Sequence, residues 1–341
     1  MPFGITFAPI NVPLRRRLQT LAVVHYVVIF LMSIGPAIPW LLITALLVFA
    51  PILSPLIISY LFWIYVWDRQ TAHRGGRRLS FMRRLSLWTY FRDFFPIDLL
   101  KTSDLDPSNN YIFCCHPHGI FSIGHFATFG TEGTGFSEKY PGITPHLMTL
   151  DVNLKAPLLR DYIMAAGVCA SSKESCLHCL NSGPGHSVAL VVGGAAESLE
   201  ARPGSTTLVL KDRRGFVKIA LMTGASLVPV YAFGENNLYK QVDNPPGSLL
   251  RRVQGRIKKT MGFAPPVFYG RGIFNYTLGL LPHRHPVHVV VGEPIDVKKV
   301  ENPDDDQVEK VYKQYTEALI QLFNSHKTKY GVSEDTELDF V

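Results

Sequence analysis

The stretch from Asn110 to Gly124 reads NYIFCCHPHGIFSIG and places two histidines, His116 and His118, on either side of a proline. The apolar run before them, Tyr111–Cys115, is typical of a short buried strand, and the proline and glycine that follow end it. The histidines are therefore expected just past a strand end, where open α/β sheets place their ligands. This loop is the first candidate for a functional site.

The local conformation separates the two histidines. Pro117 fixes its own φ and favours an extended His116, whereas Gly119 allows backbone or substrate to approach closely. The two imidazoles of the HPH triplet are expected to point to opposite sides, so only one is expected to face the reacting atoms. His118, beside the unobstructed Gly119, is preferred for that role, although a purely structural turn is an equally good interpretation of the motif alone.

A long uncharged run precedes this loop. No Lys, Arg, Asp or Glu lies between Arg17 and Asp68 in this 341-residue chain, a run of roughly fifty residues where about twenty suffice for one membrane-spanning helix. Gly35, Pro36 and Pro39 interrupt the run. We therefore expect a membrane hairpin over residues 18–67, with helices over about 18–34 and 40–65, the second kinked or lifted to the interface by its prolines.

Basic residues flank this run on both sides. Arginines at 15–17 precede it and six more lie between 69 and 84, which favours cytosolic flanks and an even number of crossings. Residues 1–17 are then a cytosolic segment, and both termini are cytosolic. The formal charge of +7 indicates contact with anionic headgroups. Nucleic-acid binding is not expected, because these arginines adjoin the membrane run and no nucleic-acid reader motif is present.

Residues 75–96 alternate arginines with Leu, Phe, Trp and Tyr at roughly helical spacing. This pattern predicts an interfacial amphipathic helix lying on the bilayer. The alternative is an ordinary surface helix of the soluble domain.

Residues 101–341 show short apolar runs separated by Gly, Pro and helical stretches, which predicts an α/β domain with a mixed or mostly parallel sheet covered by helices. The candidate strands are Tyr111–Cys115, Val188–Val192, Thr206–Leu210, Ser226–Tyr231 and Val287–Val291. The candidate helices are Ala156–Ala166, Lys173–Leu180, Gly215–Thr223 and Asp304–His326, the last with an acidic first turn that suits the helix dipole and a structural role.

Polar groups follow two further predicted strands. VVGGAAE ends in Glu197 after Gly193 and Gly194, and VPVYAFGEN ends in Glu235 and Asn236. The two glycines permit close approach of main-chain NH groups. A carboxylate that meets a histidine at neighbouring strand ends would fix the imidazole tautomer and stabilise the imidazolium. The alternative for each motif is a simple turn with a solvated carboxylate.

A basic cluster lies between these strand ends. Lys211, Arg213, Arg214 and Lys218 surround the start of a predicted helix, where the phosphates of a molecule such as coenzyme A would be bound favourably. A solvated basic face is the alternative interpretation.

Several chemistries are not supported by the motifs. No GxSxG, P-loop or full GxGxxG occurs, which argues against a serine hydrolase, a kinase and a dinucleotide dehydrogenase. Five cysteines form no disulfide framework and suit a reducing compartment. Cys176 and Cys179 have CxxC spacing without a second pair, so no metal site is expected. A histidine general base that activates a hydroxyl of the substrate remains.

Together the motifs resemble the acyl-CoA acyltransferases of the type 2 diacylglycerol acyltransferase and monoacylglycerol acyltransferase family. The resemblance rests on the double hydrophobic run and on FFP at 94–96, HPHG at 116–119, RDYIM at 160–164, GGAAE at 193–197, RRGFVKIA at 213–220, VPVYAFGEN at 228–236 and GRG at 270–272. It implies an enzyme that esterifies a lipid alcohol with acyl-CoA as co-substrate and needs no other cofactor. The enzyme is expected at the endoplasmic reticulum membrane and the lipid droplet surface, and a homo-oligomer is one assembly compatible with the resemblance.

The resemblance also implies site residues. His118, with His116 beside it, would be the catalytic centre, and Gly119, Gly193, Gly194, the basic cluster, Glu235 and Asn236 would bind substrate. The wider glycerolipid acyltransferases place an Asp five residues after the His, but here positions 121 and 123 are Phe and Ile. The acidic partner is therefore expected from elsewhere, namely Glu197.

The pattern is most similar to monoacylglycerol acyltransferases, which make diacylglycerol. Diacylglycerol acyltransferase or wax-alcohol acyltransferase activity is the close alternative, because apolar pockets discriminate only modestly between such acceptors. Alternatives from other classes are a non-enzymatic membrane scaffold or lipid-binding protein, and a metal protein that uses the two histidines.

Overall fold

The centre of the chain is a seven-stranded sheet. The computed structural model describes residues 4–34, 37–245, 247–261 and 266–341. Five strands of the sheet are parallel to one another, while β1 and β10 run the opposite way, because the β10–β7 pair is antiparallel. The order across the sheet is β1 (Ile97–Lys101), β10 (Val287–Val291), β7 (Ser226–Phe233), β2 (Tyr111–His116), β5 (His186–Val191), β3 (Thr144–Thr149) and β4 (Val168–Ala170).

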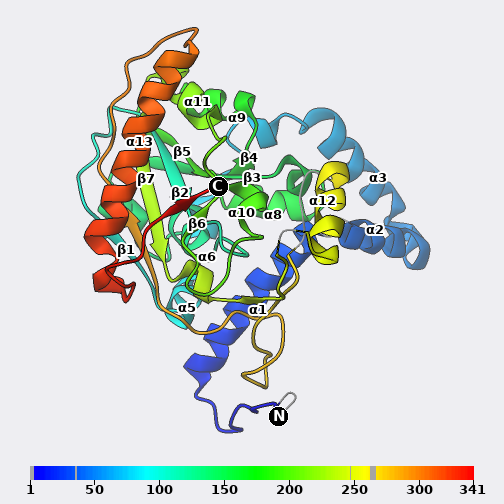
Figure 1. Cartoon of the computed structure of the whole chain (residues 1–341). Coiled ribbons are helices and arrows are strands. Elements are labelled where there is room, and N and C mark those ends of the chain that lie inside the picture. The colour runs from blue at the N-terminus through cyan, green and yellow to red at the C-terminus, as the bar shows by residue number, and fades with distance from the viewer. Residues whose placement is uncertain (1–3, 35–36, 246, 262–265) are drawn as a thin grey trace.

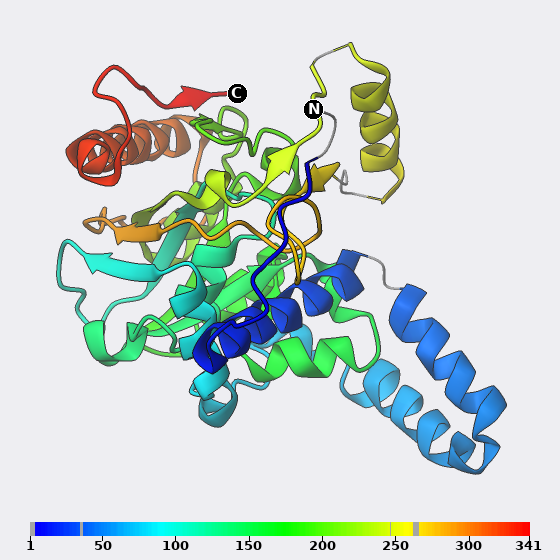
Figure 2. The ribbon, with the colours of Figure 1, turned by 90° about the horizontal axis from the view of Figure 1, so that it is seen from below.

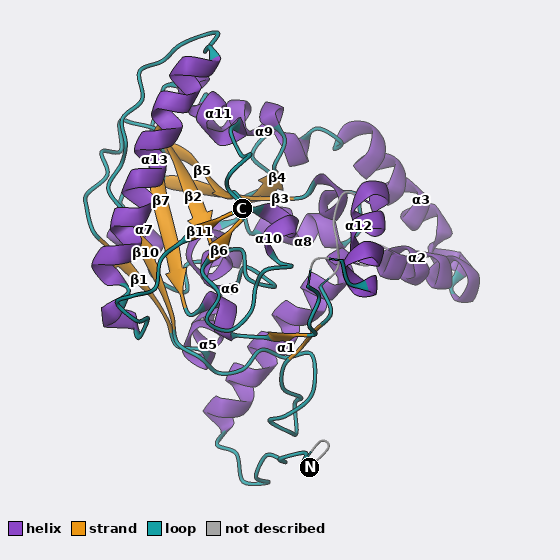
Figure 3. Ribbon diagram, in the orientation of Figure 1, coloured by secondary structure: helices purple, strands orange, loops and turns teal. Residues whose placement is uncertain are grey.

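The predicted fold class, a mostly parallel mixed sheet covered by helices, is confirmed (Figure 3). Four of the five predicted strands belong to this sheet. The remaining predicted strand, Thr206–Leu210, forms only over two residues as β6 (Thr207–Leu208), and it pairs with β11 (Asp339–Phe340) outside the main sheet. The prediction omitted β1, β3 and β4, and also a small pair of β8 (Lys240–Gln241) and β9 (Phe268–Tyr269).

Strand β2 divides the apolar core into two clusters, one on each face of the sheet. Phe113 and Cys115 belong to the cluster that includes α1 and α5, whereas Ile112 and Cys114 belong to the cluster with α9, α11 and α13. This follows from the two-residue period of a strand. Because β2 is paired on both edges and covered on both faces, all six of its residues are buried.

Helices α9 (Lys173–Leu180) and α11 (Gly215–Thr223) form where predicted. Helix α8 (Leu159–Ala165) is shorter than expected, and α13 (Asp305–His326) is stabilised by a capping box in which Asp304 and Gln307 bond each other's main-chain NH. Figure 1 shows α13 lying along the sheet. The other helices are α4 (Ser80–Arg83), α6 (Ile123–His125), α7 (Phe136–Lys139), α10 (Gly194–Glu197) and α12 (Leu249–Met261).

The first predicted membrane helix packs on the domain. Helix α1 (Leu14–Ile34) buries Ala22, Val23, Tyr26 and Val27 against the core, and the Tyr26 hydroxyl donates to the Phe121 carbonyl over 2.5 Å. The helix predicted over 18–34 therefore also belongs to the α/β domain, because one face of α1 packs on its core.

The second half of the hydrophobic run forms α2 (Ala37–Phe49) and α3 (Ser54–Phe62), joined by a 3-10 turn over Pro51–Leu53. The break at these prolines agrees with the predicted kink. Figure 2 shows α2 and α3 side by side, projecting from the rest of the chain. In the described ranges, no single helix is long and apolar enough to span a membrane. By length and composition, α1 and α2 would qualify only as a pair bent by 87°.

Residues 75–96 do not form the single helix that was expected. They contain the short α4 and α5 (Ser86–Phe94), and the aromatic face of α5 is buried at Trp88, Phe91 and Phe94. Arg83 is also buried and donates to the carbonyls of Phe129 and Ala166. The apolar face that would have met lipid instead packs on α1 and the sheet.

Candidate functional site

The two histidines lie apart, as predicted, but an extended triplet is not the reason, because residues two apart in a strand share a face. Strand β2 ends at His116, and His118 lies in the loop that follows it. His116 is fully buried and its Nε2 lies 2.9 Å from the hydroxyl of Tyr315 on α13. Burial lowers the pKa of His116 to about 3, so this ring stays neutral. His118, in contrast, lines a cavity on the other face of the sheet. A direct catalytic role for His116 is therefore not supported by its position.

The ring of His118 is oriented by its own loop. Its Nδ1 lies 3.0 Å from the Gly119 carbonyl oxygen. Because a carbonyl can only accept, Nδ1 carries the proton in this bond and Nε2 keeps its lone pair. Burial lowers the pKa of His118 below its ordinary value, which keeps the ring neutral. A neutral imidazole with a free Nε2 is what a general base requires.

Glu197 supports the histidine loop through its backbone. Its Oε1 accepts from the main-chain NH of His118 over 2.7 Å, and its Oε2 accepts from the NH of Val209 over 2.8 Å. The expected carboxylate–imidazole pair is thus not formed, because both oxygens are used by main-chain donors. Burial raises the pKa of Glu197 to about 7, against the lowering effect of these two bonds.

Gly193 is required for this arrangement. A Cβ on Gly193 would lie 2.0 Å from Oε2 of Glu197, so any side chain there would displace the carboxylate. Gly194 has a φ of +58° and borders the cavity, with no other atom within 4 Å of a Cβ built on it. The predicted close approach of substrate is therefore sterically open at Gly194, whereas Gly193 makes room for Glu197.

A second buried carboxylate holds the other end of the loop. Glu235 accepts from the NH groups of Ile123 and Gly124 over 2.7 and 2.8 Å. A Cβ on Gly119, which has a φ of +60°, would lie 2.6 Å from Cγ of Glu235. Burial raises the pKa of Glu235 to about 7. Glu235 was predicted to bind substrate, but both of its oxygens bind main chain instead.

Asn236 also differs from its predicted role. Its side-chain nitrogen donates to the Ser205 carbonyl over 2.9 Å, and the residue is buried outside the cavity lining. It therefore holds the segment after α10 in place.

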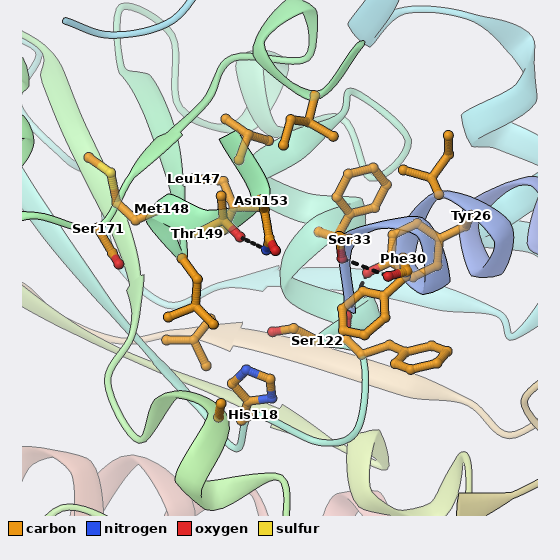
Figure 4. Close-up of a pocket in the computed structure, with 18 of the residues that line it drawn as sticks. Tyr26, Phe30, Ser33, His118, Ser122, Leu147, Met148, Thr149, Asn153 and Ser171 are labelled. Atoms are coloured by element: carbon orange, nitrogen blue, oxygen red, sulfur yellow. Dashed lines mark hydrogen bonds between the residues drawn. The ribbon is translucent and has the colours of Figure 1, made fainter. Parts of the chain in front are cut away.

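The cavity beside His118 has a volume of about 240 Å³ and a mainly apolar lining. Figure 4 shows His118 at one side, with Tyr26, Phe30 and Ser33 of α1 opposite Thr149 and Asn153. Asn153 donates to the Thr149 hydroxyl over 2.9 Å. The contribution of α1 was not predicted, because a uniformly apolar helix gives no sign of which face lines a cavity.

The basic cluster divides into two pairs. Arg214 and Lys218 form ion pairs with Glu309 and Asp305 of α13 over 3.0 and 3.3 Å. Arg213 is exposed and donates to the Gly193 carbonyl over 3.3 Å, next to the cavity, and Lys211 is exposed as well. Within this cluster of four described residues, Lys211 and Arg213 are therefore the two that form no ion pair with a carboxylate.

The RDYIM segment connects the hydrophobic run to the domain. Arg160 is buried and donates to Oδ2 of Asp68 over 2.5 Å and to the Asp68 carbonyl over 3.0 Å. Asp68 also forms an ion pair with Arg77. A buried Arg–carboxylate pair with further hydrogen bonds satisfies both charges. Sequence reasoning missed this role, although the first acidic residue after a long uncharged run is a signal for it.

The chain matches known proteins along most of its length. The sequence pattern described as "Diacylglycerol acyltransferase" matches residues 46–341. The chain is 51% identical to "Diacylglycerol O-acyltransferase 2" of Dictyostelium discoideum over 98% of this chain and 99% of that protein, and 48% identical to "2-acylglycerol O-acyltransferase 1" of Bos taurus over the same shares.

In three dimensions, the crystal structure of the 1-acyl-sn-glycerophosphate acyltransferase PlsC from Thermotoga maritima is a distant match, with 13% identity and a TM-score of 0.38 over 89% of this chain and 98% of that chain. This likeness is too remote to bear on function. The sequence matches are extensive and specific, and they agree with the motifs gathered around His118. This chain belongs to the diacylglycerol acyltransferase family.

Proposed function

We propose that this chain is an O-acyltransferase that moves a fatty acyl group from acyl-CoA to a hydroxyl of 2-monoacylglycerol and so makes diacylglycerol. The observation that carries the proposal is the neutral His118, with Nδ1 bound by the Gly119 carbonyl, at the wall of an apolar cavity. Such a cavity suits an acyl chain. The 48% identity to a 2-acylglycerol O-acyltransferase supports the acceptor.

The proposed reaction is direct transfer. Nε2 of His118 takes the proton of the glycerol hydroxyl while the hydroxyl oxygen attacks the thioester carbonyl. Main-chain NH groups near Gly119 or Gly194 stabilise the oxyanion, and collapse of the tetrahedral intermediate expels CoA thiolate, which receives the proton from the imidazolium. The thiolate is a good leaving group, so no covalent acyl-enzyme is required.

The phosphates of CoA are proposed to bind at Lys211 and Arg213. Arg213 already contacts the Gly193 carbonyl beside the cavity, which places a guanidinium near the predicted path of the thioester. Arg214 and Lys218 contribute less, because carboxylates of α13 already neutralise them.

Diacylglycerol is the second candidate acceptor. The 51% identity to a diacylglycerol O-acyltransferase favours it, and an apolar pocket separates such acceptors by only modest factors. Overlapping use of both acceptors is therefore expected.

The membrane setting is also a proposal. Helices α2 and α3 expose large apolar side chains, among them Leu41, Phe49 and Leu56, and so do the 3-10 turn between them at Ile52 and the π-helical turn after α3 at Trp67. Arginines follow these helices. We place these helices in the endoplasmic reticulum membrane with both termini cytosolic, close to the lipid substrates. Association with lipid droplets and with a second copy of the chain remain predictions.

An acyltransferase assay tests the reaction. Membranes that contain the full chain are incubated with labelled oleoyl-CoA and with mono-olein, di-olein or a long-chain alcohol, and the labelled ester is identified. Labelled diacylglycerol should form fastest, and membranes carrying His118→Ala should form none above background. Full activity of His118→Ala, or no ester from any acceptor, would refute the proposal.

A further inference from the structure

A cluster of histidine and cysteine side chains lies apart from the His118 cavity. His146 of β3, Cys169 of β4 and Cys179 of α9 place one ligand atom each within 4.8 Å of one another. All three residues are buried, and the sulfur of Cys169 lies 3.7 Å from Nδ1 of His146. They come from three elements that the sheet order brings together, since β3 and β4 are neighbours.

We infer that this cluster is a structural zinc site. Zinc prefers thiolate and imidazole ligands in a tetrahedron, and bond lengths of about 2.3 Å to sulfur and 2.0 Å to nitrogen put neighbouring ligand atoms about 3.5 to 3.8 Å apart. The 3.7 Å separation between Cys169 and His146 falls in this range. Sequence spacing gave no such prediction, because His146 and Cys169 lie far from the CxxC pair.

The surroundings of His146 fit a ligand role. With Nδ1 on the metal, the opposite nitrogen Nε2 lies 3.4 Å from Nδ1 of His186, whose ring is stacked on it at 5.6 Å. Metal-bound histidines usually donate their second ring NH to such a partner, which fixes the tautomer. His186 is therefore assigned as the hydrogen-bond partner that orients His146.

The ligand atoms within 4.8 Å of one another are three, and Cys176 is not among them. We assign Cys176 as the fourth ligand, which requires its side chain to turn toward the other three. It lies one turn before Cys179 on α9 and is equally buried. Arg78 lies close enough for its charge to act on Cys169, and it would repel a bare dication. Three thiolates around Zn²⁺ give a net charge of −1, which attracts Arg78 instead. All five cysteines of the chain are free, so these thiols are available.

The main chain closes over the cluster. Gly76 has a φ of +69°, and a Cβ there would lie 3.6 Å from the sulfur of Cys169, while one on Gly75 would lie 3.4 Å from Cε1 of His146. A metal here would thus join β3, β4 and α9 through its ligands, while Gly75 and Gly76 pack over it. Because Leu147 and Met148 of β3 line the cavity beside His118, the metal would stabilise one wall of that cavity.

Elemental analysis tests the inference. The full chain, purified in detergent with reductant from zinc-supplemented cells, should carry about one zinc per chain, as a single tetrahedral site requires. His146→Ala, Cys169→Ser and Cys179→Ser should lose most of the zinc, and Cys176→Ser should retain it less tightly. Cys114→Ala removes a buried thiol of β2 outside the cluster and should keep the metal.

A second measurement protects the test against variants that fail to fold. Cobalt added to the metal-depleted wild-type chain should give the intense thiolate charge-transfer band and the d–d bands of tetrahedral coordination. The inference is overturned if the wild-type chain holds no zinc and gives no such bands. Peptide mapping under non-reducing conditions that finds a Cys169–Cys179 disulfide as the native state would equally overturn it.

Discussion

The main-chain NH of His118 donates to Oε1 of Glu197 over 2.7 Å, while the imidazole of His118 is held by the carbonyl of Gly119. The carboxylate therefore shapes the loop that carries the base and does not touch the base itself. Glu235 does the same for the other end of the loop through Ile123 and Gly124. Glu197 and Glu235 are positioning residues, and this distinction changes what mutations should do.

Replacing each histidine should separate their roles. His118→Ala should lower kcat by a factor of roughly 10² to 10⁴, the usual contribution of a general base. His116→Ala should keep measurable transfer but lower the unfolding temperature, because it removes a buried side chain together with its hydrogen bond to the Tyr315 hydroxyl. Assays and thermal unfolding of the purified chain check both. Equal loss of activity in two stably folded variants would contradict this assignment.

The pH dependence should report a depressed base. Burial lowers the pKa of His118, so the neutral, active form persists to lower pH than for a free histidine. The midpoint of the acid limb of kcat/KM should therefore lie below the ordinary histidine pKa of about 6.5. An acid limb above that value would mean that the base is another group or that its ring is more solvated.

Glu197→Gln should impair both stability and rate. A glutamine offers one oxygen and one NH₂ group, so one of the NH groups of His118 and Val209 would face a donor. An unsatisfied buried donor costs about 1 to 3 kcal/mol. We expect a lower unfolding temperature together with a lower kcat. A large loss of kcat at unchanged stability would instead favour direct contact between Glu197 and the ring during the reaction.

The free energy of unfolding should fall as pH rises, because Glu235 loses its proton. Burial raises the pKa of Glu235 from its ordinary 4.5 to about 7, so the folded chain binds the proton more tightly than the unfolded chain does. This contribution is complete below pH 4.5 and is lost as pH rises through 7, by on the order of 3 kcal/mol. Glu235→Gln should make the unfolding temperature fall less steeply between pH 5 and 8, and the remaining fall should come from Glu197, whose pKa is also raised to about 7. Parallel curves for the two proteins would contradict this prediction.

The basic cluster should act unequally on acyl-CoA. Arg213→Ala should raise the KM for acyl-CoA several-fold, because its charge is not paired with a carboxylate. Lys218→Ala is the matched control, since Lys218 is already paired with Asp305 over 3.3 Å, and it should change KM little. Initial rates over a range of acyl-CoA concentrations decide the matter. A larger effect at Lys218 would place the CoA phosphates over the α11–α13 side instead.

The cavity wall formed by α1 should set acyl-chain length. Ile29→Trp adds bulk to the lining and should shift the preference toward shorter acyl-CoA. Val28→Trp adds the same bulk to an exposed position of α1, where the present side chain is 47% exposed, and should leave the preference unchanged. Competition between acyl-CoA of different lengths measures the shift. An equal acyl-chain-length preference in both variants would show that α1 does not line the acyl site.

The sequence by itself determined the fold class, four of the seven strands of the main sheet, several of the helices and the position of the His118 loop. The apolar run Tyr111–Cys115, with the proline and glycine after it, located both histidines at a strand end. Their separation did not follow from the period of two, which puts residues two apart on the same face; it arises because β2 ends at His116. Glu197 and Glu235 were predicted to lie near the site because each follows an apolar strand. These features are local, and local patterns carry them.

Only the tertiary structure decided what each polar group meets. Both carboxylates bind main-chain NH groups, two of the four basic residues are neutralised by α13, and α1 lends one face to the cavity. His146 reaches Cys169 and Cys179 from a different strand. Such contacts join residues far apart in the chain, and their partners are fixed by the order of strands and the packing of helices, which no local spacing encodes.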